Sequence, residues 1–162
     1  MTRTFAALAI AACALAGTAQ ADEVTTRGEY LASIMDCGGC HTRGALIGKP
    51  DPAFHLAGSD VGFELPGLGY FYPPNLTPDP DSGLGKWSAA DIVKAVRTGV
   101  RPDGRILAPV MPYHSYGKLT DADANALARY LKSLKPVKYA APPMTPHGSK
   151  APAPYLTVAV PK

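Results

Sequence analysis

Residues 36–42 read DCGGCHT, and this stretch decides what kind of fold the chain can adopt. A C-x-x-C pair followed directly by His is typical of a c-type haem attachment site. Cys37 and Cys40 would lie within one helical turn, so each thiol can add to a vinyl group of the haem. His41 would then lie beneath the iron as its proximal ligand. The motif occurs once, which predicts one covalent haem c.

The same motif has three other interpretations. C-x-x-C also occurs as a redox dithiol in thioredoxin-like proteins, as half of a zinc site and as a structural disulfide. The chain lacks a second Cys pair for zinc, and no βαβ pattern surrounds Cys37. Covalent haem is therefore favoured. We expect that Gly38 and Gly39, which have no side chains, leave room for the porphyrin edge to approach the backbone.

The composition is typical of a small domain rich in loops. The 162 residues are 46% hydrophobic, which is enough for a core, but Gly and Pro make up about a fifth of the chain. This excludes a bundle of long helices. A formal charge of +3 is too small for a nucleic-acid-binding protein, and three Cys are too few for a disulfide scaffold.

The first 21 residues have the features of a secretory signal peptide. Arg3 precedes an almost wholly apolar run over 5–17, and residues 19–21 form an A-x-A cleavage site. We expect cleavage after Ala21 and export to the periplasm, because no later stretch is long and apolar enough to span a bilayer. A retained membrane anchor and a lipoprotein box ending at Cys13 are the alternatives.

Apolar periodicity predicts three short helices. A T-x-x-E capping box at 26–29 begins the first helix. Ser88 begins the second, which ends at Gly99, and Thr120 begins the third, which ends before Pro136. The apolar residues expected on their buried faces are Tyr30, Leu31, Ile34 and Met35 in the first helix, Ile92, Val93 and Val96 in the second, and Ala124, Leu127, Ala128, Leu131 and Leu134 in the third.

The segment between the first two helices is expected to be irregular. About a third of residues 43–87 are Gly or Pro, a density that excludes regular helix. Three short helices and a long loop bury little apolar surface. A covalent haem would supply the missing core, so we expect the chain without haem to fold poorly.

The distal side of the haem needs a second axial ligand. The candidates are the remaining Met and His residues Met35, Met111, Met144, His55, His114 and His147. Met35 lies on the helix that carries the motif, and Met144 and His147 lie in a Pro-rich tail. Met111 is favoured because Pro109 and Pro112 stiffen its loop, and His114 is the runner-up. A His and Met pair saturates the iron, which favours electron transfer over binding of oxygen or peroxide.

Six pieces of the chain match, in order and spacing, a known family. They are RGEYL at 27–31, CGGCHT at 37–42, NLTPD at 75–79, GKWS at 85–88, PDGR at 102–105 and MPY at 111–113. On these pieces the chain resembles class I cytochrome c domains, and more closely the monohaem domains in cytochrome c subunits of bacterial periplasmic dehydrogenases.

The resemblance implies an all-α cytochrome c fold of three to five short helices around one covalent haem, with long loops rich in Gly and Pro. It implies that the first and last helices cross at Gly28, and it makes Met111 the distal ligand. It also implies that Asn75, Trp87 and Arg105 lie near the haem or its propionates. Those dehydrogenase subunits usually carry several haems and often an anchor, whereas this chain has one haem motif.

The resulting hypothesis is an electron carrier rather than an enzyme, with a signal peptide (1–21), a cytochrome c domain (22–137) and a Pro-rich tail (138–162). It would carry single electrons from a periplasmic dehydrogenase to a cytochrome or terminal oxidase. One alternative is a haem subunit permanently bound to a periplasmic oxidoreductase complex. Another is a haem enzyme or gas sensor with an open sixth position. The tail is expected to be either disordered or an arm that wraps the domain or docks a partner.

Overall fold

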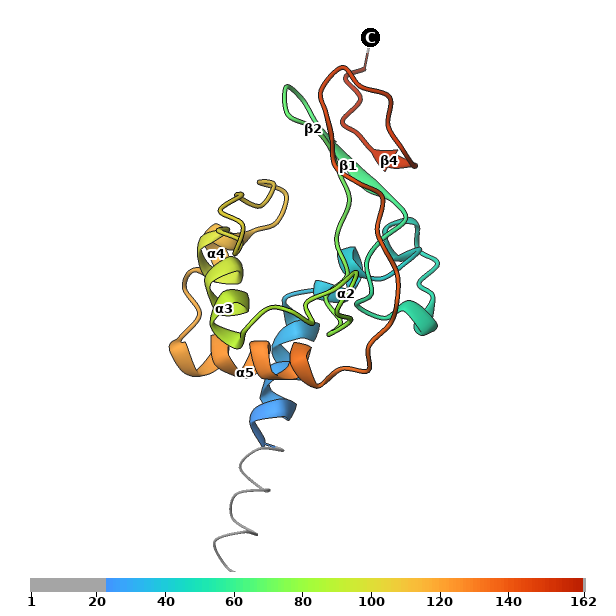
Figure 1. The fold of residues 1–162 in the computed structure, drawn as a ribbon. Helices are drawn as coiled ribbons and strands as arrows, with labels where there is room; N and C mark the ends of the chain where they lie inside the picture. The colour runs from blue at the N-terminus through green and yellow to red at the C-terminus, as the bar shows by residue number, and fades with distance from the viewer. Residues whose placement is uncertain (1–22, 162) are drawn as a thin grey trace, which may run out of the picture.

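The computed structural model describes residues 23–161 and places a small sheet above a helical body (Figure 1). The expected signal peptide lies outside the described residues. The helices of the described part are residues 23–34, α2 (Cys37–His41), α3 (Ala89–Thr98), α4 (Tyr113–Tyr116) and α5 (Asp121–Ser133), with two 3-10 turns, η1 (Ala45–Ile47) and η2 (Pro52–Phe54). The strands are β1 (Gly62–Leu65), β2 (Gly69–Phe71), β3 (Thr145–Pro146) and β4 (Tyr155–Leu156).

The helix over residues 23–34 crosses α5, and Gly28 lies at the point of closest approach. A Cβ atom at Gly28 would overlap the carbonyl oxygen of Ala126 and lie 2.6 Å from the Cβ of Tyr130, so only glycine fits. Beside the crossing, the Nε of Arg27 donates to Oδ1 of Asp123 at 2.8 Å. The expected crossing of the first and last helices is confirmed.

The buried face of the first helix differs from the prediction. Tyr30 and Ile34 were expected to be buried but are 53% and 60% exposed. The buried residues are Gly28, Leu31 and Ala32, which follow the i, i+3, i+4 spacing of one helical face. The prediction was wrong because it gave weight to large apolar side chains, whereas small residues let two helices approach closely.

The caps of the later helices agree with the prediction. Ser88 and Asp91 form a capping box, in which the Ser88 hydroxyl accepts from the Asp91 amide at 3.1 Å. Gly99 ends α3 with a left-handed φ of 75°, and the Thr120 side chain caps α5. The expected start of the first helix is wrong, because residues 26–29 lie inside a helix that is already formed at residue 23.

The helical core forms where α3 packs on α5. The apolar stripes expected from periodicity are confirmed: Ile92, Ala124, Leu127, Ala128 and Leu131 are buried, and Val93, Val96 and Leu134 pack against them while partly exposed. The rest of the core cluster comes from the first helix (Ala32), α2 (Cys37), α5 (Tyr130) and the loop after α2 (Leu56 and Leu84). The loop therefore contributes to the core together with the helices.

The sheet was not predicted, and it corrects the expectation that everything outside the helices is loop. β1 and β2 form an antiparallel hairpin in which Phe63 pairs with Phe71. The C-terminal tail adds a strand to each side of the hairpin, and the order is β3-β2-β1-β4. The strands have two to four residues, so no alternation of apolar and polar residues is long enough to read from the sequence.

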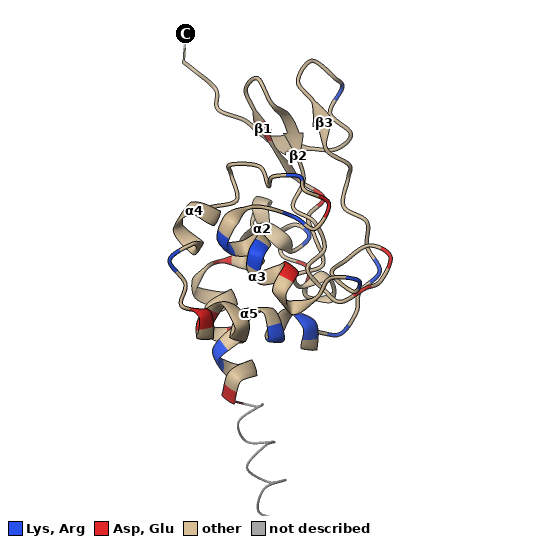
Figure 2. Cartoon of the chain, turned by 60° about the vertical axis from the view of Figure 1, so that its left-hand side comes forward, with Lys and Arg blue, Asp and Glu red and all other residues tan. Residues whose placement is uncertain are grey.

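The tail runs from the end of α5 along the body to the sheet (Figure 1). The Tyr72 hydroxyl donates to the carbonyl of Ala153 at 2.6 Å, and the Gly62 amide donates to the carbonyl of Pro154 at 2.9 Å. Lys, Arg, Asp and Glu are spread over the body with both signs mixed, and few lie on the sheet (Figure 2). Backbone and hydroxyl contacts therefore hold this end of the tail against the sheet.

Candidate functional site

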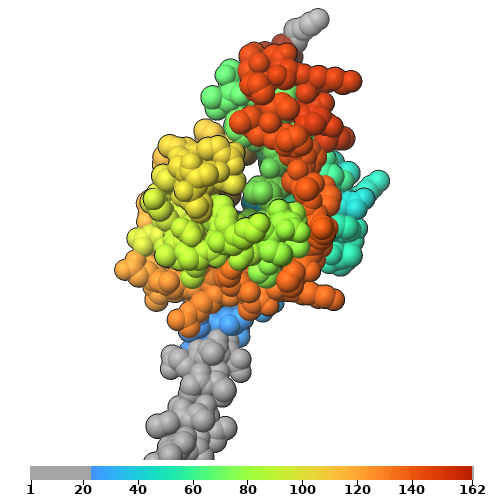
Figure 3. Space-filling view, viewed as in Figure 1, coloured from blue at the N-terminus to red at the C-terminus, as the bar shows by residue number. Residues whose placement is uncertain are grey.

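A cavity of about 870 Å³ lies between two walls of the molecule. One wall comes from α3, α4 and residues 101–112, and the other comes from α2, residues 71–84 and tail residues 140–144. Figure 3 shows the surface hollowed between the yellow segment and the orange-red tail. All seven site residues expected from the sequence line this cavity: Cys37, Cys40, His41, Asn75, Trp87, Arg105 and Met111.

α2 brings Cys37 and Cys40 to the cavity from one helical turn. Both are free thiols. Burial, with the nearby Asp36 carboxylate, raises the pKa of Cys37 to about 11 and also raises the pKa of Cys40. The two sulfur atoms are therefore protonated at neutral pH and face a space that they could share with one ligand.

Gly39 lies against the residue that precedes α2. Asp36 has a left-handed φ of 52°, and its carboxylate occupies the space that a Cβ on Gly39 would need. The expected role of Gly38 and Gly39 at the porphyrin edge stays a prediction.

His41 is buried at the end of α2, with one ring nitrogen already bonded. Its Nδ1 donates to the carbonyl oxygen of Pro74 at 2.8 Å. Burial lowers the pKa of His41, and the Pro74 carbonyl partly opposes this by favouring a protonated ring. The neutral imidazole that results carries its proton on Nδ1 and leaves Nε2 as a lone-pair donor, the state in which His binds a metal.

Met111 lies in the opposite wall, in a loop whose backbone is held on both sides. Its amide donates to the carbonyl of Ala108 at 2.9 Å, and its carbonyl accepts from the amide of Tyr113 at 2.8 Å. The structure also brings Met35 and Met144 to the same cavity, whereas the residues that line it include no other histidine than His41. The candidates for the distal ligand that line the cavity are therefore the thioether sulfurs of Met35, Met111 and Met144. Met111 stays the prediction.

Asn75, Trp87 and Arg105 line the cavity in different ways. Asn75 is 1% exposed, and protein groups already occupy both polar atoms of its side chain. Trp87 packs against the core. The Arg105 side chain is 59% exposed, and its Nε donates to Asp103 at 2.9 Å. Of the three, Arg105 is the most open to solvent.

Arg101 is a site residue that sequence reasoning missed. Its side chain is 25% exposed, its guanidinium lies 5.3 Å from the centre of the Trp87 ring, and its Nε forms an ion pair with the Asp103 carboxylate at 3.5 Å. Burial, with Arg105 nearby, lowers the pKa of Arg101, while Asp103 opposes the change. A half-buried guanidinium that lines the cavity has several N–H donors and suits an anionic group there. Arg101 and Arg105 flank one turn, and the sequence does not indicate which of the two side chains is less exposed.

Tyr116 and the tail were also missed. The Tyr116 hydroxyl donates to the carbonyl of Met35 at 2.8 Å, and burial beside Cys37 raises the pKa of Tyr116 to about 12. Residues 140–144 close the cavity from the tail side. The sequence has no signal for either contact, because both join segments that are far apart along the chain.

A family profile described as cytochrome c matches residues 25–135. The chain is 42% identical over 120 residues to the cytochrome c subunit of a quinone-type alcohol dehydrogenase from Gluconobacter oxydans. It is 42% identical over 116 residues to one of the subunits of nicotinate dehydrogenase from Pseudomonas putida, and 40% identical over 118 residues to the fructose dehydrogenase cytochrome subunit from Gluconobacter japonicus.

Each of these matches covers 72% of the chain but only a small part of the relative. The chain spans 23% of the alcohol and fructose dehydrogenase subunits and 9% of the nicotinate dehydrogenase subunit. Within residues 23–161 the structure contains no helix with the length and apolar character needed to cross a membrane. The same residues contain no cluster of three His, Cys, Asp or Glu side chains able to hold a metal ion.

Proposed function

The chain belongs to the cytochrome c family, whose cofactor is covalent haem c, and we propose that it is a monohaem electron carrier. The observation that carries the proposal is the convergence of Cys37, Cys40, His41 and Met111 on one cavity. The names of its relatives support the same role, because three of them are cytochrome subunits of alcohol, fructose and gluconate dehydrogenases.

The residues around the cavity fit a haem in three respects. The volume of about 870 Å³ falls within the range of roughly 300–1,000 Å³ usual for cofactor sites. The available donors are an imidazole nitrogen and thioether sulfurs, which are the axial ligands of haem iron in electron carriers. The half-buried guanidinium of Arg101 lines the cavity, where it would suit the negative charge of a propionate.

Cys37 and Cys40 would hold the haem through two thioethers. Each S–H adds across a vinyl double bond, so that sulfur bonds to one carbon and the thiol hydrogen goes to the other. The addition is balanced and needs no oxidant. Because α2 fixes the two thiols in one turn, the attachment also fixes which edge of the ring faces the helix.

His41 and Met111 would provide the axial ligands from opposite walls. When bound, the haem iron supplies one-electron oxidation and reduction. The Pro74 carbonyl keeps the proton of His41 on Nδ1, so Nε2 is free to ligate. Pro109 and Pro112 stiffen the loop that offers the Met111 sulfur. With both positions taken by protein, no site is left for peroxide or oxygen, which argues for a carrier and against a haem enzyme or gas sensor.

Asn75, Trp87 and Arg105 would surround the haem, with Arg101 as a fourth member. Arg101 is better placed than Arg105 to bind a propionate, because its side chain is 25% exposed against 59% for Arg105. Arg105 would act at the rim, where water and Asp103 share its charge. Trp87 would pack between Arg101 and the core.

We place the protein in the periplasm, exported by the signal peptide over residues 1–21 and cleaved after Ala21. Residues 22–137 would form the cytochrome c domain, and residues 138–162 the Pro-rich tail that adds to it. A dehydrogenase would donate single electrons, and another cytochrome or a terminal oxidase would accept them. Docking should be brief and confined to a small interface near the haem edge.

A haem subunit permanently bound to a dehydrogenase complex is the second candidate. It is favoured by the relatives, which are named as subunits and of which this chain spans a quarter or less. Purification of the native protein under mild conditions separates the two candidates. A carrier would elute alone, whereas a subunit would elute with a larger enzyme and lose it when the residues after Lys138 are removed.

Carbon monoxide binding tests the carrier proposal. The reduced wild-type protein should bind carbon monoxide slowly or not at all, and Met111→Ala should bind it as fast as the two are mixed. Met35→Leu and Met144→Leu are the matched controls, since both residues line the cavity and both variants should resemble the wild type. Rapid binding by the wild type would end the carrier proposal, and rapid binding by Met144→Leu would move the distal ligand to the tail.

A further inference from the structure

The orientation of the His41 ring depends on the peptide between Pro74 and Asn75. Among the described residues, the hydrogen bonds of the His41 side chain lead only to the Pro74 carbonyl, at 2.8 Å. A hydrogen bond of this kind fixes the tautomer and raises the basicity of the ligating nitrogen. Any group that fixes this peptide therefore acts on the lone pair of Nε2.

The Asn75 side chain fixes that peptide. It is 1% exposed, and its Oδ1 accepts from the amide and from the hydroxyl of Thr77, each at 2.8 Å. Its Nδ2 donates to the carbonyl of Val137 at 2.7 Å. The position needs an acceptor and a donor on separate atoms of one short side chain, and the amide of Asn provides them.

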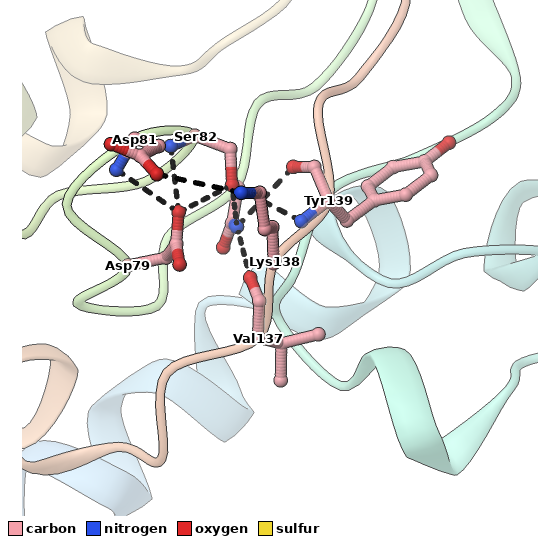
Figure 4. Close-up of polar contacts among 7 residues, drawn as sticks. Asp79, Asp81, Ser82, Val137, Lys138 and Tyr139 are labelled. Atoms are coloured by element: carbon pink, nitrogen blue, oxygen red, sulfur yellow. Dashed lines mark hydrogen bonds and ion pairs between the residues drawn. The ribbon is translucent and has the colours of Figure 1, made fainter.

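The partner of Asn75 belongs to the segment just after α5 (Figure 4). The Val137 amide donates back to the Thr77 hydroxyl at 3.1 Å. The Tyr139 amide donates to the Ser82 hydroxyl at 3.1 Å, as Figure 4 shows. Ser82 is itself held by the Asp79 carboxylate at 2.7 Å. Hydrogen bonds between side chains and backbone groups thus join residues 75–82 to residues 137–139. We call this set of contacts the lock.

This lock lies at the border of what the relatives share. The cytochrome c match ends at residue 135, two residues before Val137. From Tyr139 the chain continues directly into residues 140–144, which close the cavity. The part of the chain beyond the match therefore touches the site twice, once through Asn75 and once as a wall.

We propose that Asn75 is a positioning residue for His41 and that the segment after α5, through Val137, is its anchor. The inference rests on the proposed function, since it takes His41 as the ligand of the haem iron. Backbone hydrogen bonds from Ser59 to Pro73 and from Leu76 to Leu56 also hold this segment. When Asn75 loses Val137, the Pro74 carbonyl loses one of its restraints and the hydrogen bond from Nδ1 weakens. The imidazole then donates less charge to the iron, which favours the reduced state. The tail would in this way help to set the reduction potential.

Asn75→Ala in the full haem-bearing chain tests the proposal with two measurements. At a fixed ambient potential, the ratio of reduced to oxidised protein should rise roughly threefold, which is about 28 mV for a one-electron couple. In NMR spectra, the Nδ1 proton of His41 should exchange with water at least about ten times faster, because its hydrogen bond is weaker. Lys138→Ala is the matched control on the same segment, since its exposed side chain pairs with Asp81 at 3.6 Å and not with Asn75, Pro74 or His41 among the described residues. Both measurements should stay at the wild-type values in the control.

Two truncations separate the anchor from the rest of the tail. A chain ending after Tyr139 keeps Val137 but loses residues 140–144 and the strands β3 and β4, so the Nδ1 proton should exchange within about twofold of the full chain. A chain ending after Lys135 loses Val137 and should exchange like Asn75→Ala. Thr77→Val keeps the shape of the site but removes the hydroxyl that donates to Asn75 and accepts from the Val137 amide, while the bond from Asn75 to the Val137 carbonyl stays. Thr77→Val should shift the reduced fraction and the exchange rate in the same direction as Asn75→Ala, but by a smaller amount. It replaces Asn75→Ala as the test if that variant does not retain haem.

The outcomes distinguish this inference from the proposed function. A wild-type protein without covalent haem, or without His ligation in its spectrum, would overturn the proposed function. If the haem is bound through His41, unchanged values in Asn75→Ala or equal changes in Lys138→Ala would overturn the inference alone. If both truncations accelerate exchange equally, the tail wall rather than Val137 holds the ring, and the anchor is wrong.

Discussion

The crossing of the first helix with α5 and the four-stranded sheet both join distant parts of the chain, but different groups hold them together. At the crossing, buried side chains meet, and Gly28 leaves room for the backbone of α5. In the sheet, backbone groups pair while the side chains of Tyr155 and Leu156 stay partly exposed. The crossing thus depends on which residues are present, whereas the sheet depends on where the backbone runs.

The largest expected effect comes from removing a core side chain of α5. Leu127 is 1% exposed, so Leu127→Ala should lower the free energy of unfolding by about 2–5 kcal/mol. The matched variant in the sheet is Leu156→Ala, whose side chain is 42% exposed, and it should cost less than about 0.5 kcal/mol. Urea unfolding of the haem-bearing protein measures both values. Equal losses would mean that the sheet is held by side chains as well.

Gly28→Ala should have the next largest effect, a loss of about 1–3 kcal/mol, because the new Cβ overlaps the Ala126 carbonyl. The comparison is Gly67→Ala in the β1–β2 turn, where nothing lies within 4 Å but φ is 77°. It should cost about 1 kcal/mol through backbone strain alone. A larger residue sharpens the test in urea unfolding: Gly28→Leu should cost more than Gly28→Ala, whereas Gly67→Leu should cost the same as Gly67→Ala.

Tyr72→Phe should release the tail at a smaller cost. The variant loses the hydrogen bonds that join the Tyr72 hydroxyl to the Ala153 carbonyl at 2.6 Å and to the Ala153 amide at 3.2 Å. Their net contribution is about 1 kcal/mol, which corresponds to roughly fivefold faster proteolysis within the tail. Cleavage sites in α5 should keep their wild-type rates. Faster cleavage throughout the molecule would show that tail and body unfold together.

The smallest effect concerns the exposed ion pair at the helix crossing. Hydrogen bonds from Arg27 and Thr120 hold the pKa of Asp123 below its usual range. Because the pKa is lower in the folded state, the stabilisation is present above the ordinary Asp value of about 3.9 and is lost as the pH falls through the folded-state value. Asp123→Asn should therefore flatten the fall in unfolding free energy below about pH 4. An unchanged acid slope in urea titrations would show that the pair contributes nothing.

Local patterns account for the parts of the site that could be predicted. The C-x-x-C-H motif needs only one helical turn, so Cys37, Cys40 and His41 could be identified without knowing the fold. The caps at Ser88 and Thr120 are equally local, because each side chain bonds to a backbone group three residues away. The predicted buried face of the first helix was wrong because the contact with α5 buries small residues there, whereas the prediction relied on the size of the apolar side chains.

The sequence by itself determined a covalent haem motif, the later helices with their caps, and the apolar stripes of α3 and α5, because these signals act within a few residues. Only the tertiary structure decided that Arg101 is less exposed than Arg105, that the Val137 carbonyl binds Asn75, and that the tail forms both edges of the sheet. The physical reason for the last two is that these contacts join distant segments through backbone carbonyls and amides. Almost every residue carries a backbone carbonyl and an amide, so the pattern of side chains does not indicate which of these groups will form hydrogen bonds with each other.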